Sequence, residues 1–126
     1  MLYTLIFALG VTVVAAAPVD YTPRPATAAE RAVFRTFEPP VGVIGGKPEP
    51  WVMNEYAVAG PYALIGFSNT HAGITAFLVK KAGVWHLLMR GGGQILWGDM
   101  VRLAPEMPIA TAKSLEKLAE SQDTGG

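Results

Sequence analysis

Residues 62–93 constrain the fold of this chain more than any other stretch. Apolar and aromatic residues dominate it, and its breaks fall at residues that favour turns, first Asn69 and Gly73 and then Gly83. Because a sheet with an apolar face needs a cover, we expect the flanking segments to supply helices. The pattern predicts three strands, the last of which runs into three consecutive glycines, at residues 62–67, 74–80 and 84–90.

Helix start and stop signals flank this stretch on both sides. Thr27 and Glu30 form a capping-box pattern, in which each side chain accepts a hydrogen bond from the backbone amide of the other residue. The Pro39-Pro40 pair ends that helix, and Pro108 suits the start of a second helix over residues 109–120. Trp85 follows the glycine of the hairpin turn, and we expect it to pack against a helix as a structural residue.

Two weaker strand signals come before the central stretch. Residues 41–44 are expected to form a short edge strand, and residues 51–59 a longer strand in which Glu55 faces solvent. The resulting fold class is α+β, a small antiparallel sheet of three to five strands with N-terminal and C-terminal helices packed on one face. A cystatin-like or similar arrangement has this element order. The alternative is a small β-roll or β-barrel with helical lids.

The beginning of the chain has the features of a secretory signal peptide. Residues 1–17 contain no Asp, Glu, Lys or Arg and end in three alanines, which predicts cleavage near Ala17 and a periplasmic or secreted protein. The alternative is an uncleaved anchor, although the run is shorter than the ~20 residues of a typical membrane-spanning helix. No membrane span is expected after cleavage. The remaining chain divides into a flexible lead-in (18–26), a single α+β domain (27–120) and a disordered tail (121–126).

Composition narrows the possible functions. Ten Lys and Arg residues balance ten Asp and Glu residues, so the basic surface of a nucleic-acid-binding protein is not expected. The chain has no cysteine, which excludes disulfides and thiolate chemistry. The two histidines, His71 and His86, are not accompanied by a pattern that singles out a nucleophile and an orienting acid. We therefore expect a protein without enzymatic activity.

The segment that follows the last predicted strand is the candidate ligand-binding loop. Its glycines let a ligand approach the backbone closely, and loops held by rigid elements often carry binding. The segment lacks the spacing of a dinucleotide-binding or P-loop motif. The alternative is that the three glycines only turn the chain. The candidate site residues are Arg90, Gly91, Gly92, Gly93, Trp97 and Asp99.

His86 and Met89 are the candidate metal ligands, because imidazole and thioether groups suit copper. Strict alternation along the strand places Met89 on the side of Trp85 and Leu87, and His86 on the opposite side. On that basis the two side chains cannot easily share one ion. No other cofactor is expected.

A series of short motifs runs through the second half of the chain, namely Gly60, Tyr62-Ala63, Gly83-Val84-Trp85, Gly91-Gly92 and Pro108. In this order they resemble a group of small exported bacterial proteins, some of which are labelled copper uptake system-associated protein. The resemblance covers roughly residues 52–118. It implies an exported, non-enzymatic accessory or binding protein associated with copper uptake or handling. In that group a cysteine commonly precedes the double glycine, whereas Arg90 stands there in this chain, which argues against a thiolate metal site.

The apolar character of both sheet faces supports a second hypothesis from a different functional class. An apolar sheet face left open to solvent could dock a partner, so the protein could be a protein-interaction or inhibitor module. A membrane or periplasmic protein is the partner expected in this compartment.

Overall fold

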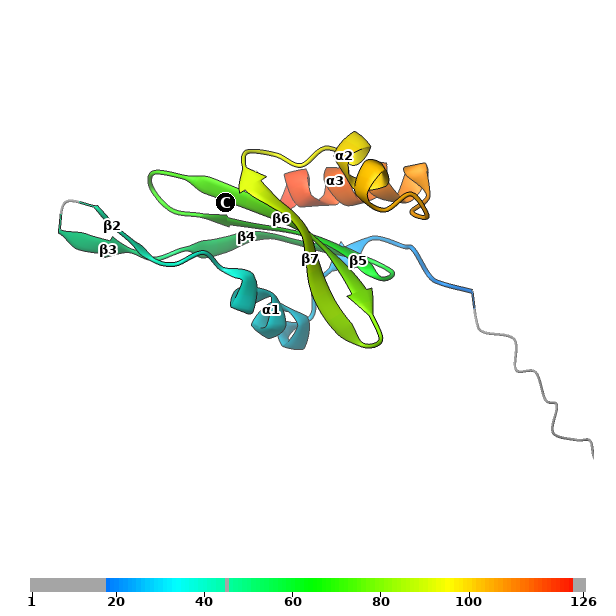
Figure 1. The fold of residues 1–126 in the computed structure, drawn as a ribbon, viewed down its shortest axis with the longest axis horizontal. Coiled ribbons are helices and arrows are strands. Elements are labelled where there is room, and N and C mark those ends of the chain that lie inside the picture. Colours follow the sequence, from blue (N-terminus) through cyan, green and yellow to red (C-terminus); the bar gives the residue numbers. More distant parts are fainter. Residues whose placement is uncertain (1–17, 45, 124–126) are drawn as a thin grey trace, which may run out of the picture.

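The computed structural model describes residues 18–44 and 46–123; the predicted signal peptide and the end of the predicted tail lie outside these ranges. The fold is α+β, as expected, and is built on a five-stranded antiparallel sheet (Figure 1). The elements in chain order are β1 (Arg24–Pro25), α1 (Ala28–Phe34), the 3-10 helix η2 (Arg35–Phe37), β2 (Gly42–Ile44), β3 (Lys47–Glu49), β4 (Val52–Ala59), β5 (Tyr62–Ser68), β6 (Gly73–Lys81), β7 (Val84–Gly92), α2 (Trp97–Leu103) and α3 (Ile109–Asp123).

The sheet has the strand order β1-β4-β5-β6-β7, and strands β4 to β7 form a meander in which each pairs with the next along the chain. Gly60 and Gly83 turn the chain between strands with φ angles of +58° and +78°, which residues with a side chain rarely adopt. The predicted strands from β4 to β7 are therefore confirmed. The expected edge strand at residues 41–44 is β2, but it pairs with β3 in a separate ribbon at one end of the molecule (Figure 1).

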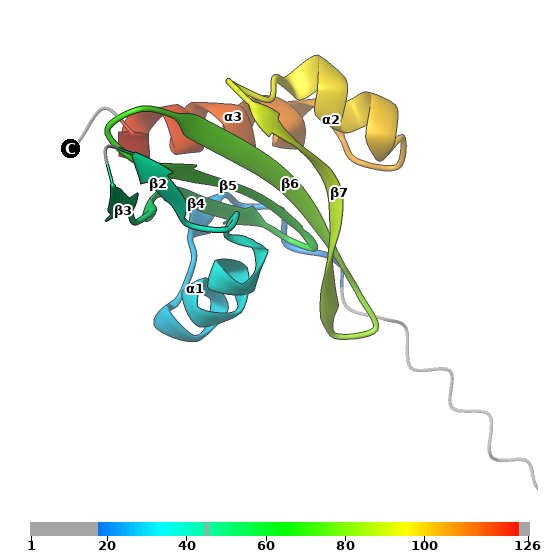
Figure 2. The ribbon, with the colours of Figure 1, turned by 60° about the vertical axis from the view of Figure 1, so that its left-hand side comes forward.

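The first and last helices pack on opposite faces of the sheet, so the expectation that both lie on one face is wrong. Figures 1 and 2 show α1 below the sheet and α2 and α3 above it. The physical reason is that both sides of β5 and β6 are apolar, and each side needs its own cover. The α3-side cluster includes Tyr62, Leu64, Phe77, Met100 and Leu115, and the α1-side cluster includes Phe34, Ile65, Phe67, Leu78 and Trp85.

Helix α1 begins at the predicted capping box. The Glu30 amide donates to the Thr27 hydroxyl, and the Thr27 amide donates to the Glu30 carboxylate, at 3.1 and 2.9 Å. The helix buries Phe34, whose ring meets the ring of Trp85 edge to face at a centroid distance of 5.1 Å. Trp85 is only 8% exposed. Its packing against a helix is therefore confirmed.

Parts of the predicted lead-in and tail are fixed on the domain. In the lead-in, Tyr21 stacks on Tyr62 with ring centroids 6.3 Å apart, and residues 24–25 pair with β4 as β1. The last helix continues to Asp123, three residues beyond the expected end. Its last turn contacts β4 through side-chain hydrogen bonds, which explains why the polar sequence there remains helical.

A β-bulge in β7 changes which face its later residues occupy. Leu87 pairs with Leu78 and Met89 pairs with Phe77, so Leu88 is an extra residue between them. Met89 therefore lies on the α3 side of the sheet, and the expectation that it shares a face with Trp85 and Leu87 is wrong.

Of the helices in the described part of the chain, none is long and apolar enough to cross a membrane.

Candidate ligand-binding cleft

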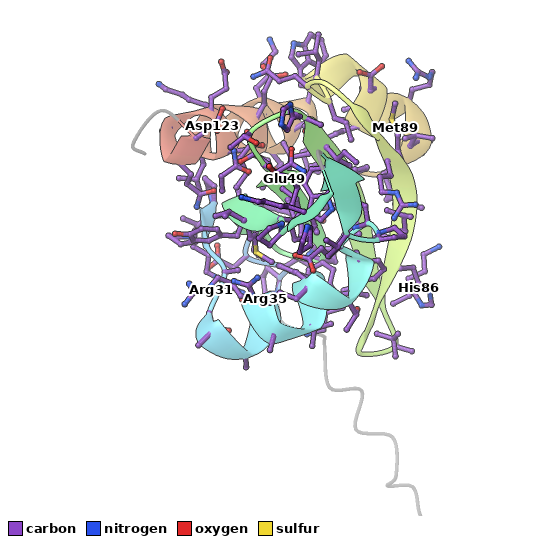
Figure 3. All side chains as sticks on the ribbon, turned by 90° about the vertical axis from the view of Figure 1, so that its left-hand side faces the viewer. Arg31, Arg35, Glu49, His86, Met89 and Asp123 are labelled. Carbon is purple, nitrogen blue, oxygen red and sulfur yellow. The ribbon has the colours of Figure 1, made fainter. Side chains whose placement is uncertain are left out.

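A cleft of about 340 Å³ opens at one end of the sheet, where β4, the turn between β5 and β6, and the last turn of α3 meet. A second hollow of about 540 Å³ adjoins it and shares three of its lining residues, Asn54, Ser68 and Asp123. Figure 3 shows this end of the molecule facing the viewer, with Glu49 and Asp123 labelled. The cleft is lined by Asn54, Glu55, Gly66, Phe67, Ser68, Ala72, Gly73, Ile74, Thr75, Gly93, Gln94 and Asp123.

Glu55 is buried in the wall of the cleft, so the expectation that it faces solvent is wrong. It is only 7% exposed and shares the α3 side of β4 with Ala57 and Ala59. On the neighbouring strand its partner is Gly66. A Cβ atom at Gly66 would lie 3.1 Å from the Cβ, Cδ and Oε1 atoms of Glu55, so the glycine provides the space that the Glu55 side chain occupies.

The surroundings of Glu55 favour its neutral form. Burial is the main cause, followed by the negative charges of Asp123 and Glu120, and together they raise the pKa of the Glu55 carboxyl from 4.5 to about 7. Glu55 also lines a second, much smaller space, together with Gln94 and with Glu116 and Glu120 of α3. Among the described residues, neither a hydrogen bond to the Glu55 carboxyl nor a nearby cation contributes to this pKa shift.

A second acceptor in the cleft also lacks a donor. The amide nitrogen of Asn54 donates to Asp123, and because an ionised carboxylate only accepts, this contact fixes the orientation of the Asn54 amide. Its other atom, Asn54 Oδ1, is buried and has no partner. The preceding residue of α3 also holds the helix against the strand, since Tyr56 N–H donates to Gln122 Oε1 at 2.7 Å.

Three acceptors that line the cleft are therefore able to bind a ligand. Asn54 Oδ1, the Glu55 carboxyl and the Asp123 carboxylate can all accept hydrogen bonds, and two of them carry or can acquire negative charge. Neither a lysine, an arginine nor a histidine lines it among the described residues. Such a site fits a ligand that brings several N–H donors and a positive charge.

The structure does not gather the six predicted loop residues in one place. Gly93 lines the cleft, and Gly91 and Gly92 end β7. Arg90 points the other way and donates to the backbone oxygen of Phe37, at 3.4 Å. The Trp97 ring lies 4.8 Å from Lys113 Nζ.

Asp99 has a structural contact within α2. Its carboxylate accepts from the Leu96 amide at 3.2 Å and pairs with Arg102 at 3.2 Å. The helix begins at Trp97, and the Asp99 carboxylate lies in its first turn. This arrangement accounts for Asp99 without a ligand.

The candidate metal ligands lie on the same side of the sheet. His86 pairs with Val79 and Met89 pairs with Phe77, and both partners belong to the α3-side cluster. The expectation that His86 and Met89 occupy opposite faces is therefore wrong, because the extra residue at the Leu88 bulge shifts the alternation by one position. Figure 3 places them at two points along β7, with His86 nearer the hairpin turn. Nowhere in the described part of the chain do three or more His, Asp or Glu side chains cluster closely enough to hold a metal ion.

No family model, no curated protein and no solved structure matches this chain. The candidate site therefore depends on the residues of this chain alone. Sequence reasoning missed Glu55, Asn54 and Asp123. The available signal was a glycine inside a strongly apolar strand, Gly66, which often marks a close approach by another group.

Proposed function

We propose that this protein is an exported, non-enzymatic binding protein that takes up a small organic cation with N–H donors in the Glu55 cleft. The observation that carries the proposal is the buried residue Glu55, which lines the cleft and whose carboxyl has no donor among the described residues. A primary ammonium group supplies three N–H donors and one positive charge. It would satisfy Glu55 and the unpaired Asn54 Oδ1 together.

The size and charge of the cleft support this ligand class. A volume of about 340 Å³ lies at the lower end of the range for small-molecule sites. Asp123 at the same cleft and Glu120 nearby add negative charge, which raises the pKa of Glu55 in the free protein and attracts a cation. A bound cation favours ionised Glu55, so binding releases a proton when the pH lies below about 7.

Titration with propylammonium, followed by amide NMR shifts of cleft residues, tests the proposal. We expect binding at about pH 8 that weakens by about tenfold or more at about pH 5.5, where Glu55 is protonated. Tetramethylammonium has the same charge but no N–H donor, and it should bind much more weakly.

Two variants sharpen this titration. Glu55→Gln removes the charge at nearly constant volume and should abolish the binding and its pH dependence. Glu38→Gln makes the same change just after η2, and it should bind as the parent does. Undiminished binding to folded Glu55→Gln protein would contradict the proposal.

Copper is a second candidate ligand, favoured by the position of His86 and Met89 on one side of β7. The resemblance to proteins labelled copper uptake system-associated protein points to the same ion. Cu(I) is a soft ion, and imidazole and thioether ligands suit it better than the oxygen acceptors of the cleft do. A Cu(I) titration should therefore shift His86 and Met89 and leave Glu55 unchanged, and it should be lost in the double variant His86→Ala, Met89→Leu.

A further inference from the structure

We propose that the outer edge of β7 and the groove beside it bind an extended acidic segment of another protein as an additional strand. This interaction is independent of ligand binding in the Glu55 cleft. β7 is the last strand of the sheet, and no other described strand pairs with its outer edge. An edge strand presents unpaired N–H and C=O groups, and extended peptides use such edges to join a sheet.

The groove lies between α1 with η2 on one side and the turn end of the β6–β7 hairpin on the other, and Val84 and Trp85 at the start of β7 line it. It has a volume of about 430 Å³, and its apolar lining includes Val33, Phe37, Val84 and Trp85. Val33 and Val84 are 45% and 55% exposed. Alternate side chains of an added strand point to the same face as Trp85, and they could cover this exposed apolar surface.

Leu87 extends the apolar surface along β7. It is 40% exposed, and its register with Leu78 places it on the Trp85 side of the strand. The bulge at Leu88 then interrupts the regular edge. The segment of β7 available for regular pairing on the turn side of the bulge is therefore residues 84–87. We expect the added strand to be short.

The charges around the edge select the kind of partner. Residues 73–92 contain Lys80, Lys81 and Arg90 but no Asp or Glu. Lys80 lines the groove, with its Nζ 5.7 Å from the centre of the Trp85 ring. This positive field favours a segment that alternates acidic and apolar residues.

Glu30 does not cancel this field. It lines the groove, but both of its carboxylate oxygens accept from Arg24, at 2.6 and 2.9 Å, and one also accepts from the Thr27 amide. A second copy of this chain would place the basic β7 edge against itself. Like charges oppose that pairing, so a different, acidic protein is the better occupant.

The probe for this surface is a short capped peptide of alternating valine and glutamate, titrated into isotopically labelled protein. We expect its chemical-shift changes to centre on residues 84–87 of β7 and on the lining of the groove. At low salt it should bind about tenfold or more tightly than the same peptide with lysine in place of glutamate. Methylation of its backbone nitrogens should remove the binding, because strand addition needs those N–H groups.

Charge reversal of the protein provides the matching test. The double variant Lys80→Glu, Lys81→Glu should weaken binding of the acidic peptide by about tenfold. The double variant Lys47→Glu, Lys117→Glu changes the net charge by the same amount away from β7, and it should have little effect on this binding. Equal binding of the lysine peptide or the methylated peptide would overturn the proposal. So would shifts of residues 84–87 that depend on protein concentration without peptide, which indicate a second copy, or displacement of the peptide by phosphatidylglycerol vesicles, which indicates a membrane.

Discussion

The Glu55 cleft and the β7 edge differ in almost every physical property. The cleft is concave and rich in acceptors, and its charged residues are acidic. The edge is an open strand beside an apolar groove, and its hairpin carries only basic charge. The balanced composition of the chain hides this separation, because opposite charges gather in different places. Net charge therefore excludes a uniformly basic surface, but it says nothing about local fields.

The largest effect that separates the two regions is expected at Trp85. Truncation to alanine removes a ring that packs on Phe34 and should lower the free energy of unfolding by about 3–5 kcal/mol. The neighbouring Val84→Ala change affects an exposed side chain and should stay within about 0.5 kcal/mol. Urea denaturation measures both. A Trp85→Ala protein that melts within a few degrees of the parent would show that α1 contributes little to holding the edge.

The next effect concerns Glu55 and the pH dependence of stability. Its pKa is raised to about 7 in the folded protein, so between the unfolded value of about 4.5 and pH 7 the native state binds more protons than the unfolded state. Stability should therefore fall as the pH rises through this window, by at most about 3 kcal/mol from this group. Glu55→Gln should remove that fall and be more stable than the parent above pH 7. Urea titrations of the parent and of Glu55→Gln at about pH 5 and pH 8 measure this difference in stability. The same pH dependence of stability in both proteins would contradict the argument from burial of Glu55.

A smaller effect is expected where Gly66 makes room for Glu55. Gly66→Ala puts a methyl group 3.1 Å from the Glu55 side chain and should cost about 1–3 kcal/mol. The substitution should also weaken the binding of any ligand that depends on the position of the Glu55 side chain. Gly73→Ala is the control, because its added methyl would meet only the Phe67 backbone oxygen, at 4.0 Å. Equal stability of the two variants in thermal melts would mean that the cleft wall adapts easily.

The smallest effect is expected at the contact between α3 and β4. Gln122→Ala removes the acceptor for the Tyr56 amide and should cost about 1 kcal/mol. Lys117→Ala changes an exposed residue of the same helix and serves as the control. Hydrogen exchange of the Tyr56 amide gives the direct measurement. Unchanged protection in the Gln122 variant would show that another group satisfies this amide.

The strands and helix starts could be predicted from the sequence because local chemistry determines them. Gly60 and Gly83 mark turns that need positive φ angles, and Thr27 with Glu30 marks the start of α1. The two faces of the sheet were harder to assign. The alternation of side chains between the two faces fails at Leu88 because of the β-bulge there. The sequence does not reveal this bulge, since the residues around it are all apolar.

The cleft could not be predicted because its parts come together only in the tertiary fold. The sequence predicts that Glu55 faces solvent, yet it shares its side of β4 with Ala57 and Ala59, which belong to the cluster that α3 covers. Asn54 meets Asp123 across 69 residues of sequence. Of the six residues predicted for the loop, only Gly93 lines the cleft. Arg90, Trp97 and Asp99 instead find partners within the protein.

The long sequence separation between β4 and the last turn of α3 has a consequence for folding kinetics. Pairing in the meander closes only short loops, whereas the contact of Tyr56 with Gln122 closes one of 66 residues. Distant contacts carry a larger entropic barrier, so we expect the hairpins to associate first and α3 to dock late. In a refolding experiment, the amides of β5 and β6 should gain protection before the Tyr56 amide does. The chain would thus pass through a state with its sheet largely assembled and its binding cleft still unformed.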